Sequence, residues 1–81
     1  MIVTLLGTSG CHLCDVAERL VRRKAPELGF IVEKLDIASS DELVERYGIS
    51  IPVLRTESGN ELFWPFDDEQ VRSWFNGLSI N

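Results

Sequence analysis

The sequence predicts an α/β fold, a four-stranded mixed sheet flanked by three helices. Two observations carry this prediction. Within residues 2–36, a strand pattern, a helical pattern and a second strand pattern follow one another, and such a βαβ unit implies parallel pairing. Later in the chain, turn residues separate two short apolar runs, which is typical of an antiparallel hairpin. A chain of 81 residues suits one domain with a modest core, so we expect a single domain over residues 1–81.

The βαβ unit begins with an apolar run at residues 2–7, which is long enough for one strand. Because the run is apolar on both faces, it indicates a central strand that is covered on two sides. Helical periodicity starts at Cys11. Pro26 is expected to kink or end this helix near Lys24, because proline removes an N–H group and clashes with the preceding turn. Glu27 and Leu28 could still add a last turn, and Gly29 is the expected terminator.

The middle of the chain predicts one strand and one short helix. Residues 30–36 form the second strand of the unit. Ser39 and Glu42 have the spacing of a capping box, which predicts that the second helix begins there. Tyr47 is expected to pack inward with its hydroxyl in water, and Gly48 lies just past the end of the helix.

The last part of the chain predicts the hairpin and a third helix. Residues 51–55 and 61–64 form the two strands, and the turn residues 57–60 connect them. Asp67 and Gln70 have the spacing of a second capping box, which is followed by apolar residues at helical spacing. The predicted order of elements is therefore βαβαββα.

Composition and charge exclude several classes of protein. Hydrophobic residues make up 44% of the chain, which argues against disorder. The net charge is −5, and the basic residues do not form the dense face that nucleic acid requires. No apolar stretch is long enough to cross a membrane, and residues 1–6 lack the features of a signal peptide. We therefore expect a cytoplasmic protein that binds neither nucleic acid nor membranes.

The only two cysteines, Cys11 and Cys14, lie where the first strand pattern gives way to the first helix. The free N–H groups and the positive end of a helix favour a thiolate there. A thiol one turn later can reach back and close a disulfide, which is the minimum equipment for dithiol–disulfide exchange. In a cytoplasmic chain, such a pair indicates catalysis or metal binding rather than a structural cross-link.

Two alternatives stay open from the residues alone. The cysteines could be idle thiols of a binding module, or they could hold a metal or an iron–sulfur cluster at a dimer interface. Zinc typically takes four ligands, and only His12 is available besides the cysteines, so we expect no metal site within one chain. A protonated His12 would stabilise a Cys11 thiolate, whereas a neutral His12 would only fill an exposed loop position.

Three motifs give the chain a family resemblance: Cys11-His12-Leu13-Cys14 after the first strand, Ser50-Ile51-Pro52 before the third, and Asp67-Asp68 at the last helix. With these motifs in this order, the whole chain resembles the thioredoxin fold and, within it, the glutaredoxin-like branch. Glutaredoxins commonly carry Cys-Pro-Tyr-Cys, and a Gly-Gly pair precedes their aspartates. This chain has Trp64-Pro65-Phe66 there, so it is similar to a divergent glutaredoxin-like group.

The resemblance implies a role for the thiols and for the proline. Cys11 would be the exposed nucleophile that forms a mixed disulfide with the substrate. Cys14 would be the more buried resolving thiol. Pro52 would follow a cis peptide bond and pack beside Cys11, and the backbone of Ile51 would pair with the substrate chain as a short added strand.

The same resemblance suggests the rest of the substrate-binding surface. His12, Leu13 and Trp64 would lie beside the thiols. Asp67 and Asp68 would either hold the glutamyl end of glutathione or simply stabilise the start of the last helix. The predicted activity is thiol–disulfide oxidoreduction on protein disulfides or glutathione mixed disulfides. It would require no metal or organic cofactor, and glutathione or a reductase protein would supply electrons to a monomer.

Overall fold

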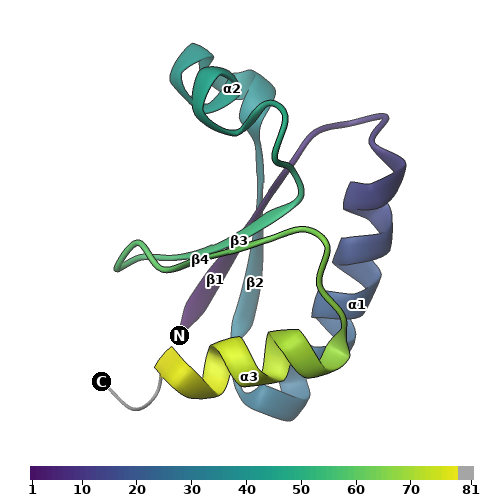
Figure 1. Ribbon diagram of the computed structural model, residues 1–81, viewed down its shortest axis with the longest axis vertical. Coiled ribbons are helices and arrows are strands. Elements are labelled where there is room, and N and C mark those ends of the chain that lie inside the picture. Colours follow the sequence, from purple (N-terminus) through teal and green to yellow (C-terminus); the bar gives the residue numbers. More distant parts are fainter. Residues whose placement is uncertain (79–81) are drawn as a thin grey trace.

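The computed structural model describes residues 1–78, and residues 79–81 of the predicted domain lie outside the described residues. The order βαβαββα and the four-stranded mixed sheet with three helices are as predicted, with one short 3-10 helix in addition (Figure 1). The elements are β1 (Ile2–Gly7), α1 (His12–Leu28), β2 (Ile31–Asp36), the 3-10 helix η1 (Ile37–Ser39), α2 (Asp41–Tyr47), β3 (Val53–Thr56), β4 (Glu61–Phe63) and α3 (Asp68–Leu78).

The first strand of the chain lies inside the sheet, as its apolar run predicts. The strand order is β2-β1-β3-β4, with β1 parallel to β2 and antiparallel to β3, and β3 antiparallel to β4. In this register Leu6 pairs with Leu35 on one side and with Val53 on the other. The carboxyl end of β1 therefore lies beside the end of β2 and the start of β3.

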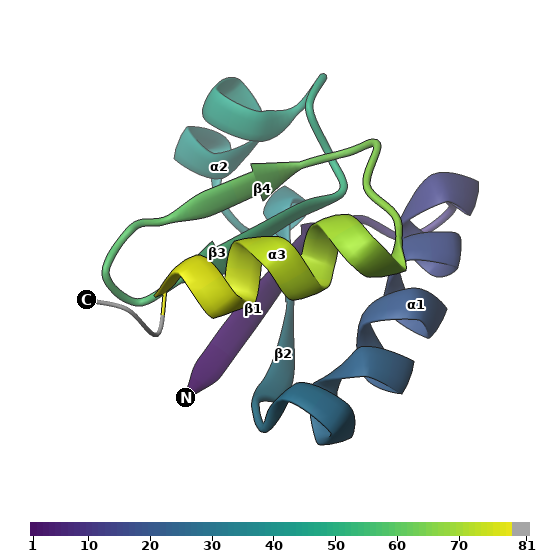
Figure 2. The ribbon, with the colours of Figure 1, turned by 60° about the horizontal axis from the view of Figure 1, so that its bottom comes forward.

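Side chains of β1 point to opposite faces of the sheet and pack into two separate hydrophobic cores. Val3 and Leu5 pack with buried residues of α1 and α3, while Leu6 packs with Tyr47 and Val53 below α2. The helices α1 and α3 therefore cover one face of the sheet and α2 covers the other, as Figure 2 shows. This layering leaves the carboxyl end of β1 close to the first turn of α1.

The helix α1 does not end near Lys24 but runs through Pro26, and the last turn expected at Glu27 and Leu28 is present. Pro26 lacks one backbone N–H and therefore removes one intrahelical hydrogen bond, and only two helical residues follow it. The expected terminator is confirmed: Gly29 adopts the left-handed conformation with φ 85°, and its N–H donates to the Ala25 carbonyl at 2.8 Å.

The helix α2 begins one residue later than its predicted capping box implies. Ser40 is the N-cap, and its side chain accepts a hydrogen bond from the N–H of Leu43. Ser39 lies in η1 instead, where its hydroxyl donates to the carbonyl of Asp36. Among the described residues, no helix is long and apolar enough to cross a membrane.

Candidate functional site

The cysteine pair lies at the first turn of α1, where a disulfide joins Cys11 to Cys14. Cys11 is the N-cap residue, and its Sγ accepts a hydrogen bond from the N–H of Cys14 at 3.1 Å. Cys11 is half-buried, whereas Cys14 is 7% exposed. The two sulfurs are therefore within bonding reach, and the first is the more accessible.

The close approach of Cys14 to the sheet depends on Gly7, the last residue of β1. A Cβ atom at Gly7 would lie 3.1 Å from the Sγ of Cys14 and 3.2 Å from its Cβ. Both separations are tighter than nine in ten real contacts of a Cβ atom, so the cysteine side chain would have to shift by a few tenths of an ångström. The absence of a side chain at Gly7 thus makes room for the buried sulfur.

The segment that precedes β3 also lies beside the cysteines, at the carboxyl end of β1. Because Leu6 pairs with Val53, continuing the register by one residue places Pro52 opposite Gly7, next to the cysteines. Pro52 is fully buried, and its carbonyl accepts a hydrogen bond from the N–H of Trp64 at 3.1 Å. The Ile51–Pro52 and Trp64–Pro65 peptide bonds are both cis.

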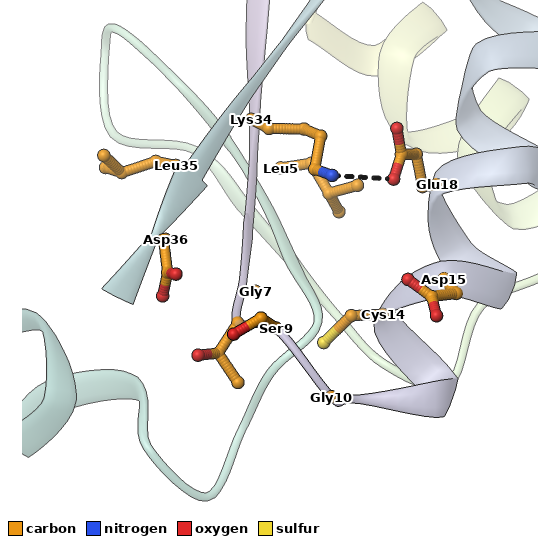
Figure 3. Close-up of a pocket in the computed structure, with 11 residues that line it drawn as sticks. Leu5, Gly7, Ser9, Gly10, Cys14, Asp15, Glu18, Lys34, Leu35 and Asp36 are labelled. Carbon is orange, nitrogen blue, oxygen red and sulfur yellow. Dashed lines mark ion pairs between the residues drawn. The ribbon is translucent and has the colours of Figure 1, made fainter. Parts of the chain in front are cut away.

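A cleft of about 460 Å³ opens beside Cys14, between α1 and the ends of β1 and β2. Figure 3 shows the sulfur of Cys14 directed from α1 toward Gly7 and Ser9 at the end of β1. Charged side chains from α1 and β2 line the rest of the cleft: Asp15, Glu18, Lys34 and Asp36.

An ion pair bridges the two walls of this cleft. Glu18 on α1 accepts a hydrogen bond from Arg22 at 2.8 Å and lies 3.0 Å from the ammonium of Lys34 on β2. The hydrogen bonds from Arg22 and Lys34 hold the pKa of the Glu18 carboxyl below its ordinary value of 4.5. The carboxyl is therefore ionised at neutral pH.

Comparison with known families identifies the domain. Residues 2–76 match the model of the Glutaredoxin-like domain (DUF836). The chain belongs to this family. No curated protein sequence matches it.

Solved structures agree with this assignment. The X-ray structure of Northeast Structural Genomics target protein XcR50 from X. campestris is 36% identical, with a TM-score of 0.79 over 93% of this chain and 96% of that chain. The solution structure of oxidised thioredoxin from Plasmodium falciparum is 13% identical, with a TM-score of 0.68 over 95% of this chain and 79% of that chain. Its likeness concerns the fold alone, which is the thioredoxin fold predicted from the motifs.

In this glutaredoxin-like domain, the two aspartates, expected either to hold glutathione or to stabilise the start of the last helix, both have partners within the protein. Asp67 forms a reciprocal capping box with Gln70: the N–H of Gln70 donates to its carboxylate at 2.8 Å, and its own N–H donates to the Gln70 side chain at 2.9 Å. Asp68 forms an ion pair with Arg23 of α1 at 2.7 Å, and Lys24 lies 3.9 Å away. The carboxylate of Asp67 therefore caps α3, and that of Asp68 joins α3 to α1.

The other predicted site residues differ in their surroundings. His12 is exposed and Leu13 is 46% exposed, both in the first turn of α1 beside the cysteines. Ile51 is half-buried and packs against the core below α2. Trp64 packs against the core below α1 and α3, with its ring edge-on to Phe66 at 5.0 Å.

Sequence reasoning missed the cleft and the environment of Tyr47. The predicted hydroxyl in water is wrong, because Tyr47 is 1% exposed and its hydroxyl donates to the carboxylate of Glu61. The positions of Lys34 and Asp36 at the end of a strand parallel to β1 were the available signal for the cleft. In residues 1–78, no group of three or more His, Cys, Asp or Glu side chains is placed to hold a metal ion.

Proposed function

We propose that this glutaredoxin-like domain is a small thiol–disulfide oxidoreductase in which Cys11 attacks the substrate and Cys14 resolves the intermediate. The disulfide at the first turn of α1 is the observation that carries this proposal. It pairs an accessible sulfur with a buried one at the positive end of a helix. The N–H of Cys14, which already donates to the Cys11 sulfur, would bind a thiolate more strongly.

The reaction needs only the two sulfurs and a substrate disulfide. The Cys11 thiolate attacks one substrate sulfur, a new S–S bond forms, and the other substrate sulfur leaves as a thiolate that takes up a proton. The Cys14 thiol then loses its proton and attacks Cys11, which releases the second substrate thiol. The substrate is reduced by two electrons, and the protein ends as the Cys11–Cys14 disulfide.

The first turn of α1 suits a protein disulfide, because the apolar side chain of Leu13, between the two cysteines, is 46% exposed. The N–H of Ile51 donates to the Tyr47 carbonyl at 3.2 Å, so we assign the Ile51 carbonyl to the backbone of a substrate chain. Glutathione mixed disulfides are the second class of substrate that we propose.

The remaining features of the proposal follow from this chemistry. A pair that must return to the dithiol form fits the cytoplasm, where thiols are kept reduced. Glutathione or a reductase protein would supply the electrons, and no metal or organic cofactor takes part. We propose that the chain acts as a monomer, which size-exclusion chromatography with light scattering would check.

A redox titration in glutathione buffers, followed by mass spectrometry, tests the function directly. We expect a reversible change of two mass units with a defined midpoint, because the internal disulfide forms and breaks. Cys11→Ser and Cys14→Ser are the matched variants. A glutathione adduct is expected on the Cys14→Ser protein, which keeps the nucleophile, and not on the Cys11→Ser protein.

Two results would contradict the proposal. Cysteines that alkylate slowly at neutral pH and show no reversible oxidation would indicate a binding module with idle thiols. Stoichiometric metal or colour in the purified protein would indicate a metal or iron–sulfur site shared between chains.

A further inference from the structure

The segment 48–52 connects α2 to β3 and carries the residues that we assign to substrate binding (Figure 1). Ile49 is completely exposed at its tip, whereas Pro52 is fully buried at its end. The segment has no regular secondary structure of its own, so its shape depends on what holds it. A substrate backbone can pair with Ile51 only if this shape is fixed beforehand.

Tyr47, the last residue of α2, holds the segment through its backbone. Its carbonyl accepts hydrogen bonds from the N–H of Ser50 at 2.8 Å and from the N–H of Ile51 at 3.2 Å. The carbonyl oxygen of Tyr47 thus accepts two hydrogen bonds from the segment, and each of them closes a turn of the backbone.

The side chain of Tyr47 is itself anchored to the sheet. Its hydroxyl donates to the carboxylate of Glu61 on β4 and accepts a hydrogen bond from Arg55 on β3 at 3.2 Å. The guanidinium groups of Arg46 and Arg55 lie 5.2 Å and 5.9 Å from the centre of its ring. Tyr47 thereby connects the segment to β3 and β4 through a partly buried polar network.

We propose that Tyr47 is a positioning residue: its hydroxyl, bound to Glu61, fixes the segment 48–52 so that Ile51 can receive the backbone of a protein substrate. This inference rests on the proposed function and adds that the site selects for polypeptide disulfides. The hydroxyl does not touch the reacting sulfurs. Its loss should therefore weaken the binding of an extended substrate without changing the chemistry of the thiols.

Two disulfide probes with the same leaving thiol separate these effects. One is bis(2-hydroxyethyl) disulfide, which has no backbone, and the other is a ten-residue peptide whose central cysteine carries 2-mercaptoethanol as a mixed disulfide. Pre-reduced protein is mixed with each probe, quenched rapidly and analysed by mass spectrometry. This single-turnover measurement gives the rate of attack and the half-saturating probe concentration.

For Tyr47→Phe we expect the half-saturating concentration of the peptide to rise about fivefold, the scale of one lost hydrogen bond. The rate with bis(2-hydroxyethyl) disulfide and the midpoint of the redox titration should stay unchanged. Glu61→Gln keeps an acceptor for the hydroxyl and should behave as the wild type. Glu61→Val removes the acceptor but leaves Tyr47 in place, so it should repeat the effect if Tyr47→Phe does not fold.

Thr56→Val is the control for a general loss of stability. Thr56 is also buried on β3, but its hydroxyl accepts from the N–H of Asn60 in the distal hairpin turn. Its loss should lower stability without changing peptide binding. The positioning role is overturned if Thr56→Val weakens the peptide equally, if both probes slow together in Tyr47→Phe, or if the peptide binds unchanged. A wild-type protein that reduces neither probe would instead refute the proposed function itself.

Discussion

Cys11 occupies a position that serine, threonine, aspartate or asparagine takes in most helices. An uncharged sulfur is a weak hydrogen-bond acceptor, but a thiolate is a strong one. Because the Cys11 sulfur accepts the N–H of Cys14, ionisation of the thiol would strengthen the cap of α1. In the proposed mechanism, helix capping and thiol activation would therefore be one interaction at this residue.

His12 is the nearest residue that could add a positive charge, and its side chain is exposed. We predict that His12→Ala raises the pKa of the Cys11 thiol by a few tenths of a unit, about the effect of one charge screened by water. Thiolate absorbance of the reduced proteins, titrated against pH, measures this shift. An unchanged midpoint would show that His12 only fills the position between the cysteines.

Gly7 gives the second prediction at this scale. In Gly7→Ala the new methyl group would press on the Cys14 sulfur, so we expect a loss of about 1–3 kcal/mol in the free energy of unfolding. Urea unfolding of the oxidised protein measures this loss. Gly77→Ala is the matched control: its new methyl group meets no atom within 4 Å, and alanine favours the helix. An equal loss in both variants would contradict the steric explanation.

At the level of the elements, the start of α3 allows a test of the two roles considered for Asp67 and Asp68, which are glutathione binding and stabilisation of the helix. We predict that Asp67→Ala lowers the free energy of unfolding by about 1 kcal/mol, because the N–H of Gln70 loses its capping acceptor. Asp67→Asn retains an acceptor and should remain within a few tenths of a kcal/mol of the wild type, again in urea unfolding.

The asparagine variant also tests the glutathione role. It removes the charge of Asp67 but keeps the cap, so its reduction of a glutathione mixed disulfide should match the wild type. A selective loss of this activity, with unchanged stability, would show that the carboxylate binds glutathione.

Helices and strands that are specified by residues close together in the sequence could be predicted from it. Where an element begins or ends at another residue than predicted, neighbouring residues explain the difference. The apolar run of β1, Gly29 and the box formed by Asp67 with Gln70 each act through neighbouring residues. The third strand was expected from residue 51, but it starts at Val53, because Pro52 has no N–H and that of Ile51 turns back to α2.

Only the part of the site that lies at the junction between β1 and α1 could be predicted from the sequence. The cysteine pair belongs to a single strand-to-helix junction, so spacing alone places both sulfurs. The cleft instead requires the parallel register of β1 and β2, and the anchoring of Tyr47 requires Glu61, fourteen residues away on β4. Side chains brought together by sheet register leave no pattern in a short sequence window.

For the whole molecule, pH dependence follows from ion pairs within α1 and between α1 and its neighbours β2 and α3. The pKa of Glu18 is lowered by Arg22 and Lys34, and that of Glu27 by Lys24 and Arg72. A lowered folded-state pKa contributes stability that is complete above the unfolded value and is lost as the pH falls through the folded value. We therefore predict that the protein loses stability as the pH falls below 4.5, the ordinary value of both groups.

Urea unfolding at a series of pH values measures this loss, and Glu18→Gln provides its control. The variant should be less stable at neutral pH by no more than about 1 kcal/mol, since the partners Arg22 and Lys34 are half-exposed. Its stability should also depend less on pH below 4.5. Parallel curves for the variant and the wild type would assign the acid sensitivity to other carboxyls.

The ring closed by the disulfide is very small, since the sequence separation of Cys11 and Cys14 is 3. A covalent link restricts an unfolded chain less when it spans fewer residues, so this one constrains the denatured ensemble only weakly. The architecture therefore relies on its two packed cores rather than on the bond. Under the proposed function, such a molecule would break and remake its own cross-link at every turnover while the rest of the chain stays in place.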